Sequence, residues 1–296
     1  MAEETLIAWT DATLNLWMGC TKVSEGCRNC YAEVLTKNRM GLHQWGPDAQ
    51  RQITKTPWDN ARRWEREAAK GDAPGHYGHA YRNALTPIVA RGCDLAVCDR
   101  SRNVGTAFDV FTPRLVFLGS LMDWAEDRRD LDPIRVRMWE LIRNSPHLWF
   151  QMLTKRPENI GKFLPPDWGP HGYENVWLGT TIEDNRVADR ARHLTSNPAR
   201  VHFVSYEPAI GPLDQLNLDG IEWVIFGGES GPGFRKHDEQ WARDMRDRCV
   251  ERGIAYFHKQ DSAMRTETNP WLVEPDGSKW AWKQYPGKLD PPVRME

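Results

Sequence analysis

Six short apolar runs recur at regular spacing in the second half of the chain. They are RLVFLGS from Arg114, LWFQMLTKRP from Leu148, NVWLGTTIED from Asn175, RVHFVSYEP from Arg200, EWVIFGGES from Glu222 and IAYFHKQ from Ile254. Near-continuous Val, Leu, Ile, Phe and Trp over this length is typical of strands buried on both faces, as in a parallel sheet. The pattern therefore predicts six parallel strands.

Amphipathic segments separate several of these runs and predict helices. DPIRVRMWELIRN (132–144) precedes the second run, and DEQWARDMRDRCVERG (238–253) precedes the last. In the latter, Trp241, Met245 and Cys249 share one face by their i, i+4 spacing. Strands that alternate with helices imply right-handed βαβ crossovers. We therefore expect an α/β fold, a partial parallel TIM-like barrel of (β/α)6 type.

The remainder of the chain is less regular. CYAEVLTKNRM predicts a helix that opens at Cys30, and PWDNARRWEREAAKG predicts another that ends at Gly71. Residues 72–113 are rich in Gly, Pro, Asp and Arg and are interpreted as an insertion, while residues 262–296 carry repeated prolines and predict an extended C-terminal wrap. A length of 296 residues suits one such barrel, so we expect 1–296 to form a single domain with an irregular N-terminal loop.

The composition bears on the location and binding partners of the protein more than on its activity. The chain has 39 basic and 41 acidic residues, so its global charge indicates neither nucleic acid nor a membrane, although local basic patches can bind phosphates. No run of about 20 apolar residues occurs, and the start MAEETLIAWTDAT lacks the pattern of a signal peptide. We expect a cytoplasmic protein without membrane contact, where clustered cysteines more often hold metal than form disulfides.

Polar residues follow each apolar run. Ligands of parallel barrels bind at the C-terminal ends of the strands, so we expect these residues to share one polar cavity. They are Gly119, Ser120, Asp123, Thr154, Lys155, Arg156, Thr180, Thr181, Glu183, Ser205, Glu207, Gly227, Gly228, Glu229, Ser230, His258, Lys259 and Gln260. FGGESGPG matches no phosphate-binding motif, and its glycines are interpreted as permitting close approach of a ligand to backbone. LTKRP offers two cations to a carboxylate or phosphate, or forms surface salt bridges.

The stretch WMGCTKVSEGCRNCYAE carries three of the six cysteines, namely Cys20, Cys27 and Cys30. One interpretation is structural zinc, which normally takes four protein ligands, so that His43, Cys93 or Cys98 would have to complete the site. A second is simple packing of buried thiols, although TKVSEG between the first two is polar. A third is an iron–sulfur cluster held by three thiolates, which leaves one iron without a protein ligand.

A free iron has a defined use in radical-SAM chemistry. There the iron is chelated by the amino and carboxylate groups of S-adenosylmethionine, and an electron from the cluster cleaves the sulfonium C–S bond to give a 5′-deoxyadenosyl radical. Such enzymes place the three-cysteine loop before the first helix of a partial barrel, as YAEVLTKNRM follows the loop here. Their commonest motif is CxxxCxxC, whereas this loop reads CxxxxxxCxxC.

Seven blocks extend this similarity along the chain: WTDATLNLWMGCTKVSEGCRNCYAE, FLGSLMDW, FQMLTKRPENI, VWLGTTIED, FVSYEPAIGPLD, WVIFGGESGPG and YFHKQ. In this order they resemble the phage-associated three-Cys-motif family, which is classed with radical-SAM-like proteins and is distantly similar to spore photoproduct lyase. The resemblance runs from about Ile7 to Gln260 and excludes the segment with Cys93 and Cys98. These two cysteines could form a second metal site, donate hydrogen or be incidental, and Cys249 is expected to pack.

The resemblance implies a [4Fe-4S] cluster on Cys20, Cys27 and Cys30, with S-adenosylmethionine as second cofactor and an electron donor of flavodoxin or ferredoxin type. The residues that it implies for cofactor binding are Gly119, Ser120, Asp123, Thr180, Thr181, Glu183, Gly227 and Gly228. Of these, GSLMD stands where the amino group of S-adenosylmethionine usually binds, and TTIED suits its ribose or carboxylate. The expected catalytic residues facing substrate are Lys155, Glu207, Glu229 and His258, with Arg156 and Lys259 beside them.

We expect a radical-SAM enzyme that modifies a nucleobase or nucleotide, with phage DNA as the target and the host cytoplasm as its location. The phage context, the similarity to a DNA-repair lyase and the cations in TKRP, FRKH and HKQ motivate this hypothesis. A net charge of -2 disfavours tight non-specific duplex binding, so an extruded base or free nucleotide suits the chain better. The alternatives are a zinc-stabilised, non-catalytic module that binds nucleic acid or a partner protein, and a radical-SAM enzyme acting on a peptide or small metabolite.

Overall fold

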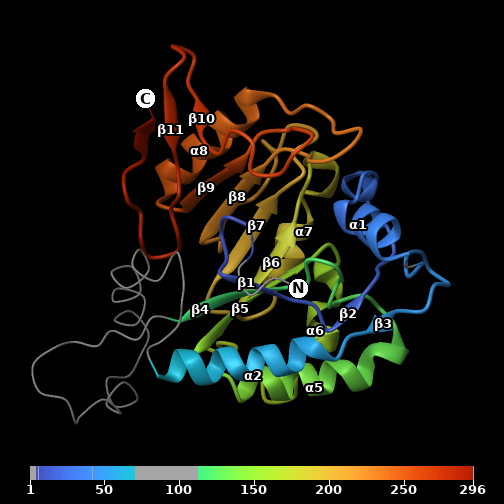
Figure 1. The fold of residues 1–296 in the computed structure, drawn as a ribbon. Helices are drawn as coiled ribbons and strands as arrows, with labels where there is room; N and C mark the ends of the chain where they lie inside the picture. The colour runs from blue at the N-terminus through green and yellow to red at the C-terminus, as the bar shows by residue number, and fades with distance from the viewer. Residues whose placement is uncertain (1–4, 6, 42, 71–112, 296) are drawn as a thin grey trace, which may run out of the picture.

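A curled parallel sheet of seven strands forms the centre of the protein, a half-barrel with helices on its outer face (Figure 1). The computed structural model describes Thr5 and residues 7–41, 43–70 and 113–295. In spatial order the strands are β1 (Ala12–Leu14), β4 (Arg114–Leu118), β5 (Leu148–Thr154), β6 (Val176–Thr181), β7 (His202–Tyr206), β8 (Trp223–Gly227) and β9 (Ala255–Gln260). All neighbours pair in parallel.

The six predicted strands and the partial-barrel class are confirmed. The seventh strand, β1, has only three residues, too few for a periodic signal, and it pairs with β4 at one edge of the sheet. The predicted helices are α1 (Tyr31–Met40), α2 (Thr56–Ala69), α5 (Asp132–Arg143) and α8 (Glu239–Arg252). Two further short helices, α6 (Ile160–Phe163) and α7 (Arg190–Thr195), follow β5 and β6. Residues 207–222, between β7 and β8, contain no helix, so the β/α alternation is interrupted there.

Alternate side chains of the strands enter two separate cores, because successive residues of a strand point to opposite faces. On the outer face, Val116, Phe150 and Val204 belong to a large core that includes side chains of α2, α5, α7 and α8. Cys249 of α8 is fully buried in it, as expected. On the inner face, a smaller core is rich in aromatic residues: Trp9, Phe117, Trp149, Trp177, Phe203, Trp223, Phe257 and Tyr285.

The inner face changes from aromatic to polar along the strands. In β5 and the residue after it, the inward side chains run from Trp149 to Lys155, and in β7 they run from Phe203 to Glu207. Trp9, from the segment before β1, fills the aromatic end, with its ring 4.6 Å from Phe117 between centroids. Aromatic side chains therefore fill the half-barrel at the N-terminal ends of its strands, and polar groups line it at the C-terminal ends.

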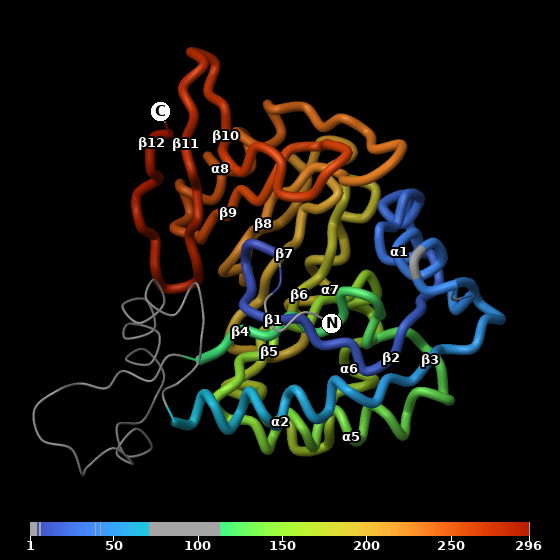
Figure 2. Tube along the Cα trace, viewed as in Figure 1, coloured from blue at the N-terminus to red at the C-terminus, as the bar shows by residue number. Residues whose placement is uncertain are grey.

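Two small sheets flank the half-barrel (Figure 2). Strands β2 (Trp17–Met18) and β3 (Gln52–Ile53) pair beside the cysteine stretch. The C-terminal residues form β10 (Leu272–Val273), β11 (Lys279–Ala281) and β12 (Val293–Met295), next to α8 and β9. The predicted insertion, apart from Pro113, and with it Cys93 and Cys98, lies outside the described residues. Among the described helices, none combines the length and apolar character needed to cross a membrane.

Candidate functional site

A cavity of about 690 Å³ lies at the C-terminal ends of the strands and is lined by all three clustered cysteines. Its volume falls within the range typical of small-molecule sites. Of the predicted site residues, those in its wall are Cys20, Cys27, Cys30, Gly119, Ser120, Asp123, Lys155, Thr181, Glu207, Gly228 and Glu229. Segments distant in sequence thus contribute to one chamber. Of the residues predicted for the cluster, the cofactor or catalysis, those outside its wall are Thr180, Glu183, Gly227 and His258, and of the other polar strand-end residues Arg156 and Gln260 also lie outside it.

Thr180 and His258 miss the cavity because they belong to the outer face of the sheet. Thr180 is fully buried and donates a hydrogen bond from Oγ1 to the Thr154 carbonyl at 2.9 Å. His258 is also fully buried, and its ring stacks on Phe226 with centroids 5.3 Å apart. The expectation that these two side chains face a ligand is therefore wrong. Their strand neighbours Thr181 and Lys259 point inward instead.

Gly227 and Gly228 make room for protein rather than for a cofactor. A Cβ at Gly227 would come within 2.9 Å of Glu207 Cδ, and a Cβ at Gly228 would come within 2.1 Å of the Ser262 backbone nitrogen. Both close approaches are internal, so the predicted close approach of a ligand to this backbone is not what requires the glycines. Gly119 is different, because its φ of +114° lies in the region that favours glycine at the turn after β4.

The cysteine loop, residues 19–30, is held by three carboxylate–arginine pairs at strand ends. The first joins Asp123, after β4, to Arg156, after β5, with 2.7 Å between Oδ2 and Nη1. The Arg156 guanidinium also donates to the Thr21 carbonyl at 2.6 Å and lies 3.4 Å from Cys20 Sγ. Because Asp123 further accepts from the Thr154 hydroxyl at 2.5 Å, both of its carboxylate oxygens are occupied within the protein. Asp123 also lines the cavity, so its expected contact with a cofactor amino group stays a prediction.

The second pair, Glu183 and Arg190, lies after β6 directly beneath the loop. Glu183 Oε2 accepts from Arg190 Nη1 at 2.9 Å, and Oε1 accepts from the Ser24 hydroxyl at 2.6 Å. A Cβ on Gly26 would come within 2.3 Å of Glu183 Cγ, so the loop rests against this side chain. Glu183 is only 1% exposed. The expected role in binding ribose or carboxylate is wrong, because both oxygens are already used to position the loop.

The third pair, Glu229 and Arg235, follows β8. Arg235 donates to Glu229 from Nε at 2.9 Å and from Nη2 at 2.5 Å, and its Nη2 also donates to the Glu25 carbonyl at 3.1 Å. Asn29 Nδ2 donates to Glu229 Oε2 at 3.1 Å. Burial raises the pKa of Glu229, but the hydrogen bonds from Arg235 and Asn29 outweigh it and hold that pKa below its ordinary value. Glu229 is thus held in place by these bonds, and because it lines the cavity its expected catalytic role stays a prediction.

Cys20, Cys27 and Cys30 are half-buried in the wall of the cavity. Burial raises the pKa of the Cys20 thiol to about 12, with Asp123 adding to the rise and Arg156 opposing it. Burial also raises the pKa of Cys30. Tyr31, which opens α1 next to Cys30, donates from its hydroxyl to the Ser120 carbonyl at 2.8 Å. This contact ties the helix after the loop to the turn after β4.

The remaining wall of the cavity carries one close charge pair. Lys259 Nζ donates to Glu207 Oε1 at 2.5 Å, and the two side chains are 10% and 20% exposed. Lys155, Thr181 and Ser205 supply further polar groups to the wall. Unlike the carboxylates that hold the loop, Glu207 faces the chamber with only one of its oxygens in a hydrogen bond to this lysine. This pair is the best placed to meet a substrate.

Several residues that shape the site had no signal as functional residues in the sequence. They are Asn15, Ser24, Asn29, Tyr31, Arg190 and Arg235. Asn15, for example, donates to Ser120 Oγ at 2.8 Å and accepts from the Leu121 backbone nitrogen at 2.7 Å, and so fixes the turn after β4. The loop residues could be identified as partners only from the fold.

Comparison with known proteins gives a family without an assigned activity. Neither curated proteins nor solved structures gave a match. A family model described as "Protein of unknown function (DUF5131)" matches residues 4–287, which include the cysteine loop and every strand of the half-barrel. Since this match spans most of its length, the chain belongs to the DUF5131 family.

Proposed function

We propose that this protein is a radical-SAM enzyme that holds a [4Fe-4S] cluster on Cys20, Cys27 and Cys30 and cleaves S-adenosylmethionine to modify a nucleobase or nucleotide. The observation that carries the proposal is the shared cavity. Three thiols and the polar strand ends of a parallel half-barrel line one chamber of about 690 Å³. Ligands of parallel barrels bind at this end of the strands.

The spacing of the thiols favours a cluster over a single ion. In the described part of the chain, the three sulfurs are not all within 4.8 Å of one another, and His43 is exposed. Tetrahedral zinc, with thiolates at about 2.3 Å, brings its sulfurs to about 3.8 Å of one another. In a cubane cluster each cysteine binds a different iron, so the sulfurs stand farther apart. The spacing thus argues against a zinc-stabilised binding module.

The residues around the loop have defined tasks in this proposal. A bound and reduced cluster supplies the electron that cleaves S-adenosylmethionine and so opens hydrogen-abstraction chemistry. Arg156 donates toward Cys20 Sγ, and the Ser24 hydroxyl lies 4.0 Å from Cys27 Sγ. Hydrogen bonds to cluster sulfurs tune the reduction potential. The three carboxylate–arginine pairs fix the positions of these donors and of the thiols relative to one another.

The cavity wall offers groups for both S-adenosylmethionine and a substrate. The hydroxyl of Thr181 suits ribose, and the turn at Gly119 and Ser120 suits the amino group of the methionyl part, so these remain our proposed cofactor contacts. Ser205 adds a second hydroxyl that suits ribose. Glu207 and Lys259 are then left for the substrate, with Lys155 available to a carboxylate or phosphate.

A nucleotide or an extruded base is the substrate class that we favour. Lys155 lines the cavity and can neutralise phosphate, while Lys22 and Lys259, also in its wall, already pair with Glu33 and Glu207. The net charge of -2 offers little to an intact duplex, whose non-specific binding depends on neutralising many phosphates. A base taken out of its stack reaches an enclosed site of this kind. DNA of a phage is therefore a reasonable first substrate to test, with peptides and small metabolites as the alternative class.

The identity of the metal bound by the three thiols tests the proposal. Protein purified and reconstituted without oxygen should contain about four iron and four sulfide per chain, and S-adenosylmethionine should alter the electron paramagnetic resonance spectrum of its reduced cluster. Cys27→Ala should lose the iron and keep its circular dichroism spectrum. Cys249→Ala, in the outer core, is the matched control and should keep the iron. Wild-type protein that takes up zinc on these thiols and forms no cluster would overturn the proposal.

A further inference from the structure

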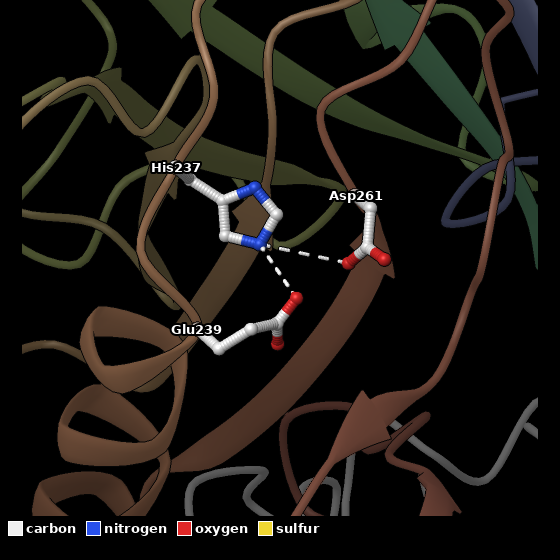
Figure 3. A group of neighbouring side chains, drawn as sticks. All are labelled: His237, Glu239 and Asp261. Atoms are coloured by element: carbon white, nitrogen blue, oxygen red, sulfur yellow. Dashed lines mark ion pairs between the residues drawn. The ribbon is translucent and has the colours of Figure 1, made fainter.

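Four ionisable side chains meet outside the cavity, between the start of α8 and the end of β9. Three of them, His237, Glu239 and Asp261, are drawn in Figure 3, where the imidazole points toward both carboxylates. His237 Nε2 lies 3.3 Å from Glu239 Oε1 and 3.6 Å from Asp261 Oδ1. The fourth, His258 of β9, places Nε2 3.6 Å from the same Asp261 oxygen. None of these residues lines the cavity of the three thiols.

The polar atoms of this cluster are buried without hydrogen bonds in the described structure. They are His237 Nε2, Glu239 Oε2, Asp261 Oδ1 and both ring nitrogens of His258. The His258 and His237 side chains are 0% and 5% exposed, while those of Asp261 and Glu239 are 14% and 35% exposed. Buried polar groups of native proteins are almost always satisfied, and each exception calls for an explanation such as an ion.

A metal ion on His237 Nε2 would offset the two carboxylates that this nitrogen faces. Nε2 stands 3.3 Å and 3.6 Å from the two carboxylate oxygens, beyond the usual N–H···O range of about 2.7–3.2 Å. Without a proton or an ion on that nitrogen, its lone pair would face two anions. The Ser262 hydroxyl lies 3.0 Å from Nδ1 and can accept its proton, which frees the Nε2 lone pair for a ligand bond. The Ser262 backbone N–H donates to Nδ1 at 3.2 Å, so binding of an ion through Nε2 would require this hydrogen bond to be given up.

We propose that His237, Glu239 and Asp261 bind a divalent cation of the zinc type. Their ligand atoms lie within 4.8 Å of one another. Zinc with nitrogen and oxygen ligands at about 2.0–2.1 Å spaces them at about 3.3–3.4 Å, close to the separations found here. Two chemical types, imidazole and carboxylate, suit zinc better than the all-oxygen sites of magnesium or calcium. His258 stands behind Asp261, where an imidazole N–H can orient a ligating carboxylate.

The proposed ion would join two segments that build the wall of the cavity. His237 follows Arg235, which holds Glu229 and the cysteine loop, and Asp261 follows Lys259, which pairs with Glu207. An ion between them fixes the segment after β8 to the end of β9. Its role is therefore structural, and it does not depend on what the three thiols bind.

The test uses cobalt(II) as a spectroscopic probe on the purified full chain. Cobalt at this site should give the visible bands of tetrahedral nitrogen and oxygen ligation without the sulfur charge-transfer band that cysteine ligation adds. Asp261→Asn and His237→Ala should remove these bands, while Glu251→Gln, an exposed change on the same helix, should keep them. Zinc should raise the melting temperature of the wild type and not that of Asp261→Asn.

A measurement without any variant guards against misfolding of the altered proteins. Wild-type crystals soaked in zinc should show an anomalous peak between His237, Glu239 and Asp261. A cobalt spectrum that contains only sulfur-ligated species, or zinc-soaked crystals with no peak at these residues, would overturn the proposal. Unchanged cobalt bands in a folded Asp261→Asn protein would do so as well.

Discussion

Ser24 donates a hydrogen bond of 2.6 Å to the carboxylate of Glu183, which lies 159 residues later in the chain. The contact seats the cysteine loop on the end of β6. Asp123–Arg156 and Glu229–Arg235 hold the same loop from the ends of β4, β5 and β8. From their chemistry, carboxylates at strand ends would be expected to bind a ligand. Here they serve largely to place the three thiols around the cavity.

Replacing Glu183 with glutamine should disturb both the fold and the loop. The change keeps the shape of the side chain but leaves Arg190, whose side chain is 10% exposed, without its anion. Breaking a buried ion pair by removing one partner costs about 3 kcal/mol or more. We therefore expect urea denaturation to show a loss of about this size, with lower iron uptake after reconstitution. Glu174→Gln, exposed just before β6, is the matched control, and equal stability of the two variants would contradict this account of Glu183.

Gly26→Ala should displace the loop from its seat. The added methyl would come within 2.3 Å of both Cγ and Oε1 of Glu183, whose buried position leaves little room to move. Ser24→Ala removes a hydrogen bond from the same carboxylate without adding volume and should cost only about 1 kcal/mol. Iron content and thermal unfolding should rank the proteins as wild type, Ser24→Ala, then Gly26→Ala. A Gly26→Ala protein as stable and as rich in iron as Ser24→Ala would show that the contact is not tight.

Glu207→Gln should separate cofactor chemistry from substrate chemistry. Glu207 and Lys259 line the cavity but contact neither the thiols nor the pairs that hold the loop. We expect the variant to keep its cluster and to release 5′-deoxyadenosine, while modified substrate falls at least about tenfold because a substrate contact is lost. Mass spectrometry of nucleosides and of 5′-deoxyadenosine measures both yields. A parallel loss of 5′-deoxyadenosine would place Glu207 at the cofactor instead.

Lys283 should make stability depend on pH in the alkaline range. Burial lowers its pKa to about 8, against partial opposition from Glu267, while its Nζ lies 4.5 Å from the centroid of the Phe257 ring. Between about pH 8 and the ordinary lysine pKa of 10.5, the unfolded chain binds more protons than the folded one, so this residue makes stability rise with pH. Below pH 8 its cost is constant.

Lys283→Met should remove that contribution. Denaturation curves of the two proteins should converge or cross as pH rises, with a change in their difference of about 3 kcal/mol across the window. Lys279→Met, at an exposed position of β11, controls for loss of a lysine charge from the same C-terminal segment. A difference between wild type and Lys283→Met that does not vary with pH would mean that Lys283 is charged and well solvated in the folded protein.

The sequence predicts the sheet well because burial on both faces leaves a continuous apolar run in every long strand. The run does not say which polar residue at its end faces the cavity. The alternation of side chains between the two faces of a strand does predict it. Thr181 and Lys259 share the inner face with Trp177 and Phe257, whereas Thr180 and His258 lie on the opposite face. Applying this two-residue period to the strand ends would have excluded Thr180 and His258 from the predicted site.

The roles of the strand-end carboxylates could not be predicted in the same way. Whether Glu183 or Glu229 meets a ligand depends on which loop folds over it, and that loop comes from the other end of the chain. A short sequence window contains the carboxylate and at most one of its partners. The cluster of His237, Glu239 and Asp261 was missed for a related reason, since Asp261 joins the other two only through the packing of β9 beside the start of α8.

The central claim is that the three thiols make S-adenosylmethionine cleavable, and one measurement addresses it directly. Reconstituted protein is reduced with dithionite in the presence of S-adenosylmethionine, and 5′-deoxyadenosine is quantified by mass spectrometry. We expect the wild type and Cys249→Ala to form 5′-deoxyadenosine. We expect Cys20→Ala, Cys27→Ala and Cys30→Ala to form none above background. Wild-type protein that carries a full iron–sulfur cluster but forms no more 5′-deoxyadenosine than these three variants would contradict it.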